Sequence, residues 1–428
     1  EGWRSVPLKY MALSKDSLFI DGDWIESKDI SDEGIKYITT GNVGEGKYKE
    51  QGLGFITDEK FHELNCTEVF QGDLLISRLN PPIGRACIVP DLNSRVVTSV
   101  DNVIFRPDSS FFEGYLVYLF TSPEYFMHTG NLARGATMQR ISRGLLGNIR
   151  FEIPSYKEQQ TIAQFLDYET AKIDALIAKQ EQLIELLKEK RQAVISHAVT
   201  KGLNPDAPMK DSGVEWLGQV PEHWEVVAVR NVTKFVSTGS TPKREESFTE
   251  TEEVNWFTPG DFLSHFILTD SEKYISRDSV IKGDAKLYPA NSVVIIGIGA
   301  TLGKVAVINK EFSCNQQINV VVPNEKIESH FLAYSLLAQK EQMQLSSNSS
   351  TIGIMNQDKT KSLKILAPPI SEQLKIINFI RNELEKFDSL ESKVLGLNLL
   401  LQERKTALIS AAVTGKIDVR DWQPPSVG

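Results

Sequence analysis

The strongest constraint on the fold is that this chain of 428 residues repeats itself. Residues 153–159 match residues 367–373, and the offset of 214 is the separation between Pro154 and Pro368. The same offset, without a gap, matches Ile162 to Ile376, Phe165 to Phe379, Arg191 to Lys405, and residues 193–200 to residues 407–414. An internal repeat of this length predicts two similar structural units.

A looser match extends upstream of the close one. The aligned segments are residues 1–3 with 222–224, 37–42 with 256–261, 72–76 with 291–295, and 84–85 with 303–304. Each half of the chain is therefore expected to be a variable globular part followed by a better-matched helix.

The better-matched parts predict two long helices. Apolar or long side chains recur in alternating steps of four and three from Ile162 to Val194 and from Ile376 to Leu408, which is the pattern of a coiled-coil seam. Prolines precede both segments and glycines follow them, at Pro154, Pro369, Gly202 and Gly415. A helix of about 45 residues reaches some 65 Å, longer than a compact domain needs. The repeat favours a paired rigid spacer over the alternative, a bundle in which each helix packs on its own domain.

The globular parts are predicted to be mixed but rich in strands. Short strands are expected at residues 74–77, 86–89, 293–297 and 305–308, and short helices at 114–120 and 330–338. The connector 201–222 holds Pro205, Pro208 and Pro221 and is expected to be an extended linker.

Composition indicates an ordinary folded protein, because 41% of the residues are hydrophobic. The most apolar stretch, Val293 to Gly299, is too short to span a bilayer, and we see no secretion signal. The chain begins at Glu1 rather than Met, so a few native residues are expected to precede it. The cysteines Cys66, Cys87 and Cys314 lack paired spacing, which argues against disulfides and zinc and favours the cytoplasm. The six histidines show no metal spacing either.

The net charge of −9 is unfavourable for a nucleic-acid-binding protein, because duplex binding rests on neutralising phosphates. The local distribution differs from the average. The stretch 131–150 contains no acidic residue and four arginines, Arg134, Arg140, Arg143 and Arg150.

Residues 211–225, DSGVEWLGQVPEHWE, resemble the segment that precedes a target recognition domain in specificity subunits of Type I restriction–modification enzymes. Residues 1–3 resemble the end of the same segment, and the helix from Glu158-Gln159 to Gly202 is similar to the spacer helix of that family. The resemblance covers nearly all of the chain. It is strong in the helices and the linker and weaker within the globular parts.

The resemblance implies an α+β fold with a pseudo-twofold internal repeat, in which two strand-rich α/β domains are separated by two long helices that form an antiparallel coiled coil. The implied parts are target recognition domain 1 (1–155), spacer helix 1 (156–200), a linker (201–222), target recognition domain 2 (223–369), spacer helix 2 (370–414) and a tail (415–428).

The resemblance also implies that the chain reads DNA without doing chemistry on it. Each domain would read one half of a bipartite target in double-stranded DNA, with half-site centres about one helical turn, ~34 Å, or a multiple apart. Two modification subunits, which carry S-adenosylmethionine, would dock on the helices, and restriction subunits would join them. This chain would hold no cofactor of its own. Because the two globular parts differ in sequence, the target should be asymmetric.

Two motifs suggest other chemistry. Asn80-Pro81-Pro82-Ile83 resembles the Asn-Pro-Pro-aromatic loop with which adenine N6-methyltransferases hold a flipped base, but Ile83 replaces the stacking ring. We interpret it as a turn that touches DNA, since Arg78 and Arg85 flank it. Gly297 to Gly303 resembles a dinucleotide loop, but a strand is expected to follow it, so a glycine hairpin is favoured.

Two loops at matching places are the main candidate DNA contacts, 134–140 and 349–357, since Thr137 and Thr351 are again 214 residues apart. Arginine reads guanine edges, and glutamine and asparagine read adenine edges. The basic turn 238–244 is a candidate phosphate clamp, and a solvated loop is the alternative in each case. The full candidate set is Arg78, Asn80, Arg85, Arg134, Thr137, Gln139, Arg140, Arg143, Thr241, Lys243, Arg244, Thr301, Lys304, Ser349, Thr351, Asn356, Gln357 and Lys359.

Two rival functions remain open at this point. One is a self-contained adenine N6 DNA methyltransferase that uses residues 80–83, and the other is an assembly scaffold that does not bind DNA. The charged helix face at 188–191 is either solvated or a docking surface for the modification subunits.

Overall fold

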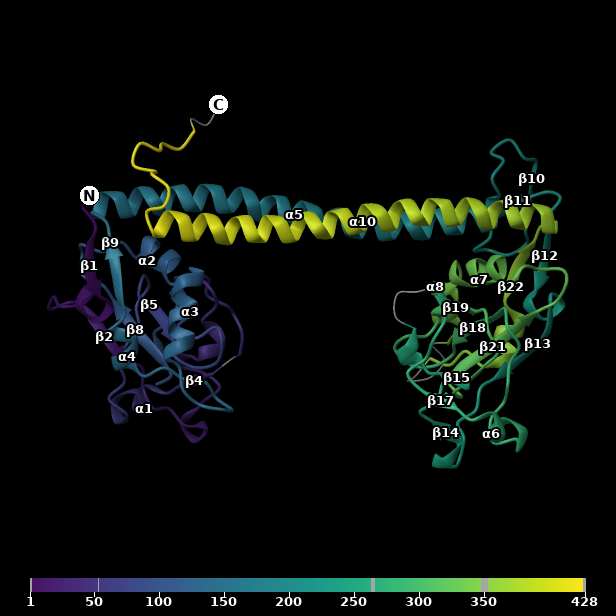
Figure 1. Ribbon diagram of the computed structural model, residues 1–428, viewed down its shortest axis with the longest axis horizontal. Helices are drawn as coiled ribbons and strands as arrows, with labels where there is room; N and C mark the ends of the chain where they lie inside the picture. Colours follow the sequence, from purple (N-terminus) through teal and green to yellow (C-terminus); the bar gives the residue numbers. More distant parts are fainter. Residues whose placement is uncertain (1, 53, 263–265, 348–352, 426–428) are drawn as a thin grey trace. The chain divides into compact units, whose positions relative to one another are not determined.

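The computed structural model describes residues 2–52, 54–262, 266–347 and 353–425 (Figure 1). It divides into two compact units. Unit 1 comprises residues 1–181 and 395–428, and unit 2 comprises residues 182–394. Each unit holds one globular part and a stretch of both long helices.

The long helices are α5 (Tyr156–Lys201) and α10 (Ile370–Val413), which lie side by side in Figure 1. In unit 1 the start of α5 and the end of α10 share one core, which includes Ile162, Leu166, Ile409 and Val413. In unit 2 the end of α5 and the start of α10 share another core, which includes Ile195, Val199, Ile376 and Ile380. The helices therefore pair antiparallel, which confirms the predicted coiled coil.

An ion pair between the helices recurs in both units. In unit 1 the Lys405 Nζ lies 2.5 Å from Asp174 Oδ1. In unit 2 Arg191 pairs with Asp388. The offset of 214 residues relates Asp174 to Asp388 and Arg191 to Lys405, so the repeat places the same pair at both ends of the coiled coil.

The globular part of unit 1 is built mainly on two sheets. The first has the order β2-β8-β5-β6, all antiparallel, with β2 (Leu18–Asp21), β8 (Asn102–Arg106), β5 (Leu74–Ser77) and β6 (Ala86–Ile88). The second has the order β4-β3-β7, with β4 (Phe55–Ile56), β3 (Ile35–Ile38) and β7 (Val96–Thr98). β1 (Arg4–Pro7) pairs with β9 (Arg150–Ile153). The helices are α1 (Asp58–Glu63), α2 (Glu113–Leu119), α3 (Pro123–Leu132) and α4 (Arg143–Gly147).

Unit 2 repeats this plan with one more strand in each of its two main sheets. Its first sheet has the order β13-β21-β18-β19-β16, with β13 (Thr233–Thr238), β21 (Ile318–Pro323), β18 (Ser292–Ile296), β19 (Val305–Ile308) and β16 (Ile267–Leu268). Its second has the order β14-β17-β15-β20, with β14 (Phe248–Thr249), β17 (Tyr274–Ile275), β15 (Val254–Phe257) and β20 (Phe312–Cys314). β12 (Glu225–Ala228) pairs with β22 (Lys364–Ala367). The helices are α6 (Arg277–Ile281), α7 (Ser329–Leu337), α8 (Lys340–Ser347) and α9 (Gln357–Ser362).

The apolar central strands are explained by burial on both faces. In β5, Leu74 and Ile76 join the core shared with the helices, whereas Leu75 joins a second core. In β18, Val293 and Ile295 join the core shared with the long helices, whereas Val294 and Ile296 join a second core of unit 2. Because successive side chains alternate between the faces of a strand, a strand between two cores needs an unbroken apolar run.

The linker differs from the prediction. Residues 201–222 include a two-stranded antiparallel hairpin, β10 (Met209–Asp211) with β11 (Gln219–Pro221). The ammonium of Lys201 donates to the carbonyl oxygens of Leu217, at 3.0 Å, and of Gln219. The hydrogen bonds of the hairpin and of Lys201 hold the segment against the end of α5, where an extended chain was expected.

A buried glutamine anchors the start of each long helix to its globular part. Gln159 Oε1 accepts from the backbone N–H of Phe112 at 2.7 Å, and its Nε2 donates to the carbonyl oxygens of Pro154 and Ser110 at 3.0 and 3.2 Å. Gln373 makes the equivalent contacts in unit 2. Its Oε1 accepts from the backbone N–H of Glu328 at 2.8 Å, and its Nε2 donates to the carbonyl oxygens of Pro368 and Lys326 at 2.8 and 3.0 Å. The shared Glu-Gln dipeptides at 158–159 and 372–373 thus have a structural cause.

A glycine and a tryptophan meet just beyond the end of each long helix. Gly202 has a φ of +79°, and a Cβ there would lie 3.2 Å from the ring of Trp224. Gly415 has a φ of +70°, and a Cβ there would lie 3.3 Å from the ring of Trp3. Both positions require the left-handed conformation that glycine adopts without strain.

The cysteines are buried free thiols. Burial raises the pKa of Cys66 to about 11 and that of Cys87 to about 12, so both stay protonated near neutral pH. Within the described residues, His, Cys, Asp and Glu side chains form no group that could hold a metal ion. The same residues include no helix long and apolar enough to cross a membrane.

Candidate nucleic-acid interface

The loop between α3 and α4 holds two of the basic candidates of unit 1, Arg134 and Arg140, and Arg143 begins α4. The backbone N–H and C=O groups of Arg134 and Arg140 exchange two hydrogen bonds, at 2.8 and 2.9 Å, which close residues 135–139 into a tight loop. Thr137 and Gln139 lie exposed in it, and their side chains make no hydrogen bond with any described residue. The loop therefore offers unengaged polar groups on a fixed backbone.

A second loop, after β5, supports the first one. The N–H of Asn80 donates to the carbonyl of Gln139, and the N–H of Ile141 donates to that of Arg78, both at 3.0 Å. The Arg78 guanidinium donates back to the Ile141 carbonyl at 3.3 Å and also binds the Val100 carbonyl. The two loops thus form one hydrogen-bonded structure.

This engagement removes Arg78 from the candidate DNA contacts. Its side chain is only 5% exposed, and its Nε lies 3.1 Å from Asp21 Oδ1. Burial lowers the pKa of Arg78, while the carboxylates of Asp21 and Asp101 act against that change. A buried guanidinium that is already hydrogen-bonded supports the loops rather than reaching a ligand.

Arg85 and Lys304 are half-buried rather than buried, and we assign their cationic groups to holding the backbone of their own units, outside the proposed contacts. Arg85 donates to four carbonyl oxygens, those of Thr40, Val43, Leu79 and Asn80, at 2.7 to 3.0 Å. Lys304, its repeat partner, donates to the carbonyl of Phe262 at 2.8 Å. Val43 and Phe262 occupy equivalent positions of the looser alignment, so both units use this cation to secure the same turn.

Arg140 and Arg143 remain on the surface. Arg140 lies 2.9 Å from Asp101 Oδ1, and Arg143 lies 3.7 Å from Asp21 Oδ2. Both arginine side chains are close to half exposed, at 45% and 44%. Sequence reasoning missed the two aspartates, because they are distant along the chain and no local pattern points to them.

Asn80 and Arg134 are also exposed. Asn80 has a φ of +59°, and its carbonyl accepts from Arg85. Arg134 donates to the carbonyl oxygens of Asn131 and Ala133 at 3.2 and 2.9 Å. Ile83 is 2% exposed within the core, so the turn 80–83 presents no side chain at the place where a base-stacking ring would be needed.

Unit 2 has an equivalent pair of loops. Ile298 and Ile354 form a bridge, as Leu79 and Arg140 do in unit 1, and the N–H of Met355 donates to the carbonyl of Gly297 at 2.8 Å. Strands β18 and β19 flank residues 297–304 as an antiparallel hairpin, so this glycine motif is not followed by the helix that a dinucleotide loop needs.

The candidates in these loops are more engaged than those of unit 1. Asn356 caps α9 by accepting from the N–H of Lys359, Gln357 donates to Thr238 Oγ1 at 3.1 Å, and the ammonium of Lys359 binds the Ile354 carbonyl at 3.1 Å. Thr301 is half-buried. Ser349 and Thr351 lie outside the described residues.

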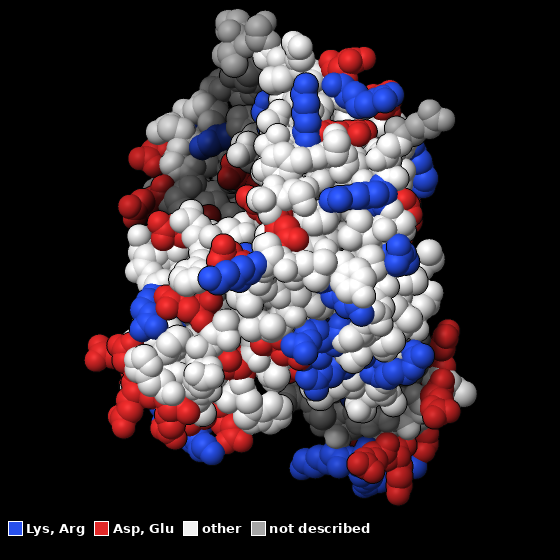
Figure 2. Space-filling view, turned by 90° about the vertical axis from the view of Figure 1, so that its left-hand side faces the viewer, with Lys and Arg blue, Asp and Glu red and all other residues white. Residues whose placement is uncertain are grey.

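The basic turn 238–244 leaves Lys243 exposed. Thr241 donates its hydroxyl to Gln316. Arg244 lies 3.9 Å from Asp284 and is 63% exposed, so its guanidinium is only loosely held. Figure 2 views the side of unit 1, where acidic and basic side chains are interspersed and a group of basic ones lies in the lower half of the view. The net charge therefore does not describe the local surface.

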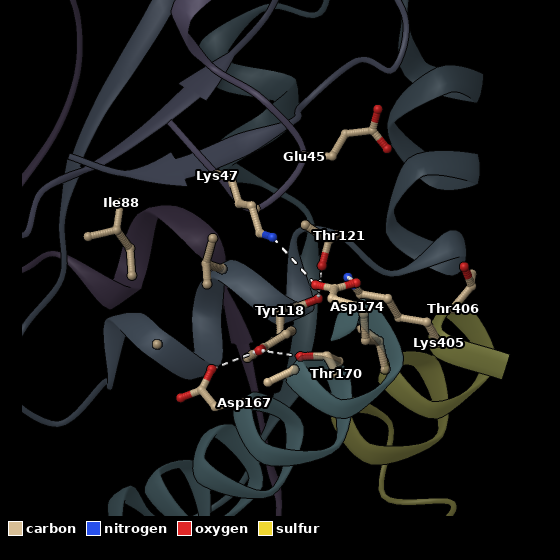
Figure 3. Close-up of a pocket in the computed structure, with 15 residues that line it drawn as sticks. Glu45, Lys47, Ile88, Tyr118, Thr121, Asp167, Thr170, Asp174, Lys405 and Thr406 are labelled. Atoms are coloured by element: carbon tan, nitrogen blue, oxygen red, sulfur yellow. Dashed lines mark hydrogen bonds and ion pairs between the residues drawn. The ribbon is translucent and has the colours of Figure 1, made fainter. Parts of the chain in front are cut away.

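A cavity of about 540 Å³, lined by both charged and apolar residues, lies where the globular part of unit 1 meets the helices (Figure 3). Lys47 and Lys405 both approach Asp174 there, at 3.5 and 2.5 Å. Burial alone would raise the pKa of Asp174, but the two ammonium groups hold it below its usual value. Tyr118 donates to Asp167 at 2.7 Å across the same cavity. These contacts join a loop, α2, α5 and α10, and we interpret the cavity as a structural joint.

A family model described as the Type I restriction modification DNA specificity domain matches residues 2–186 and again residues 221–395. The putative type I restriction enzyme MjaX specificity subunit of Methanocaldococcus jannaschii is 23% identical over 386 residues, which are 88% of this chain and 86% of that protein. The type I restriction enzyme StySPI specificity subunit of Salmonella potsdam is 22% identical over 440 residues, which cover 99% of this chain and 90% of that protein.

Solved structures share the fold. A chain from a study of complex assembly and conformational transition of the type I R-M system has a TM-score of 0.74 and 15% identity, covering 97% of this chain and 98% of its own. The HsdS subunit of Thermoanaerobacter tengcongensis has a TM-score of 0.56 and 16% identity, covering 97% of each chain.

Proposed function

Because this chain belongs to the family of Type I restriction modification DNA specificity domains, we propose that it reads a bipartite, asymmetric target in double-stranded DNA. The observation that supports the proposal is the pair of equivalent backbone bridges at the base of these loops, Leu79 with Arg140 in unit 1 and Ile298 with Ile354 in unit 2. Their side chains differ between the units, as two different half-sites require.

We propose as DNA contacts the candidates that remain after Arg78, Arg85 and Lys304 are assigned to structural roles. In unit 1 they are Asn80, Arg134, Thr137, Gln139, Arg140 and Arg143. In unit 2 they are Thr241, Lys243, Arg244, Thr301, Asn356, Gln357 and Lys359, together with Ser349 and Thr351 of the segment outside the described residues. Guanidinium and amide groups suit base edges, and lysine ammonium groups suit phosphates.

The proposal includes partners. The relatives are subunits of restriction enzymes, and we expect this chain to assemble in the cytoplasm with two modification subunits and with restriction subunits. S-adenosylmethionine would bind in the modification subunits, and this chain would be non-catalytic. The burial of Ile83 supports that division of labour over a methyltransferase site at residues 80–83.

The test is a binding comparison. Methylome sequencing of cells with and without the chain would give the target. The chain with its modification subunits should then bind that duplex at least tenfold more tightly than a scrambled duplex at moderate salt. Replacing residues 1–153 with the equivalent part of another reader should change one half-site only. Equal affinity for both duplexes, or an unaltered target after the replacement, would contradict the proposal.

Arg140→Ala is expected to weaken target binding by roughly 1–3 kcal/mol, which is the usual effect of losing an arginine contact to a base. Arg420→Ala is the matched control, because Arg420 is an exposed arginine paired with Asp418 in the tail and lies outside the loop. Titration of a labelled duplex at fixed salt measures both variants. Equal losses for the two, or none for Arg140→Ala, would remove Arg140 from the interface.

A further inference from the structure

The tip of the loop 134–140 carries an apolar side chain that the proposed function does not use. Met138 lies between Thr137 and Gln139 and is 59% exposed. A single exposed apolar side chain is ordinary on a protein surface, but Met138 lies directly between two proposed DNA contacts, Thr137 and Gln139.

The backbone around Met138 is fixed. The hydrogen-bonded pair of Arg134 and Arg140 closes the loop, and Gly135 has a φ of +114°. The Met138 carbonyl packs so closely on Gly135 that a Cβ there would lie 2.2 Å from its oxygen. Any side chain at position 135 would therefore have to displace the backbone at the tip.

The loop is also tied to the core of unit 1. The backbone carbonyl of Gln139 accepts from the N–H of Asn80, and Ile141, two residues further on, is fully buried. Met138 is thus an exposed apolar group on a preorganised backbone, so binding through it would cost little backbone conformational entropy.

The chemistry of the neighbours indicates what Met138 contacts. Gln139 can pair with adenine through its N6 and N7 atoms, and Arg140 with guanine. On the major-groove edges of the bases, the apolar group is the C5-methyl of thymine. We propose that Met138 packs against the 5-methyl group of a thymine in the half-site read by unit 1. This inference rests on the proposed function.

The experiment replaces each thymine of the target, one at a time, with deoxyuridine, which lacks that methyl group. The chain with its modification subunits should lose about fourfold in affinity at one thymine, the effect of burying one methyl group less. Met138→Ala should bind the thymine and deoxyuridine duplexes equally at that position, yet still prefer the target to a scrambled duplex. Met138→Leu should keep the difference.

Met127→Ala is the matched control. Met127 is 66% exposed, in the same unit, but on α3 rather than in the loop, and its variant should keep the full sensitivity to deoxyuridine. Wild-type insensitivity at every thymine would overturn the inference, and so would an unchanged sensitivity of Met138→Ala. Weaker binding of Met138→Ala without any effect of deoxyuridine would overturn it in favour of a side chain wedged between bases. Failure of the wild-type complex to prefer its target would instead contradict the proposed function.

Discussion

Trp224→Ala is expected to lower the free energy of unfolding of unit 2 by about 3–5 kcal/mol, as truncations of large buried side chains do. Trp224 is fully buried in the core that joins the end of α5, the linker and the start of α10. Its ring contacts Phe331 edge-on, with 6.4 Å between centroids, and packs against Gly202. Its removal would leave a cavity where three segments of unit 2 meet.

Hydrogen exchange of backbone amides in unit 2 measures this loss without requiring that both units unfold together. Trp24→Ala is the control, since Trp24 is 67% exposed and its loss should change stability by less than about 0.5 kcal/mol. Trp3, the repeat partner of Trp224, is only half-buried, so Trp3→Ala should cost unit 1 less than Trp224→Ala costs unit 2. If Trp224→Ala and Trp24→Ala both changed the free energy of unfolding by a similarly small amount, the prediction would be wrong, because the core would have repacked to fill the cavity.

Gln159→Leu is expected to destabilise unit 1 by about 3 kcal/mol or more. Leucine has a similar size but leaves the N–H of Phe112 and the carbonyl oxygens of Ser110 and Pro154 without their partner. A buried polar group that loses its partner costs about 1–3 kcal/mol. The start of α5 would then detach from the globular part more readily than its middle unfolds.

Gln164→Leu is the matched substitution, because Gln164 is exposed on the same helix and should tolerate leucine. Thermal unfolding and amide exchange near residues 110–112 should separate the two variants. Gln373→Leu should reproduce the effect of Gln159→Leu, but in unit 2, where Gln373 makes the same contacts. If Gln159→Leu and Gln164→Leu had the same unfolding temperature and amide exchange, the anchoring role assigned to Gln159 and Gln373 would be wrong.

The sequence predicted the architecture well, because its signals are periodic. The heptad steps of α5 and α10 and the offset between the halves are readable without coordinates, and the structure confirms an antiparallel pair. The strand-rich α/β plan of each globular part also follows from short apolar runs beside glycine turns. The hairpin in the linker was missed, because its prolines outweighed the weak strand pattern at 209–211 and 219–221.

The candidate site was predicted less completely. Arg78 and Arg85 flank the same turn as Asn80, and nothing in their neighbours distinguishes them from a surface arginine. Their burial depends on carbonyl oxygens distant along the chain, such as those of Val43 and Ile141. Sequence spacing cannot supply such contacts, whereas the Arg140 guanidinium stays nearly half exposed beside Asp101 at the surface.

The carbonyl at the base of each loop has a different buried donor in the two units. In unit 1 the Ile141 carbonyl accepts from the Arg78 guanidinium, and in unit 2 the equivalent Met355 carbonyl accepts from the Asn319 amide at 2.6 Å. A loop transplanted from one half to the other would arrive above a donor of the wrong length and charge. An exchange of target specificities should therefore transfer each loop together with its buried donor, Arg78 or Asn319, rather than the exposed loop residues alone.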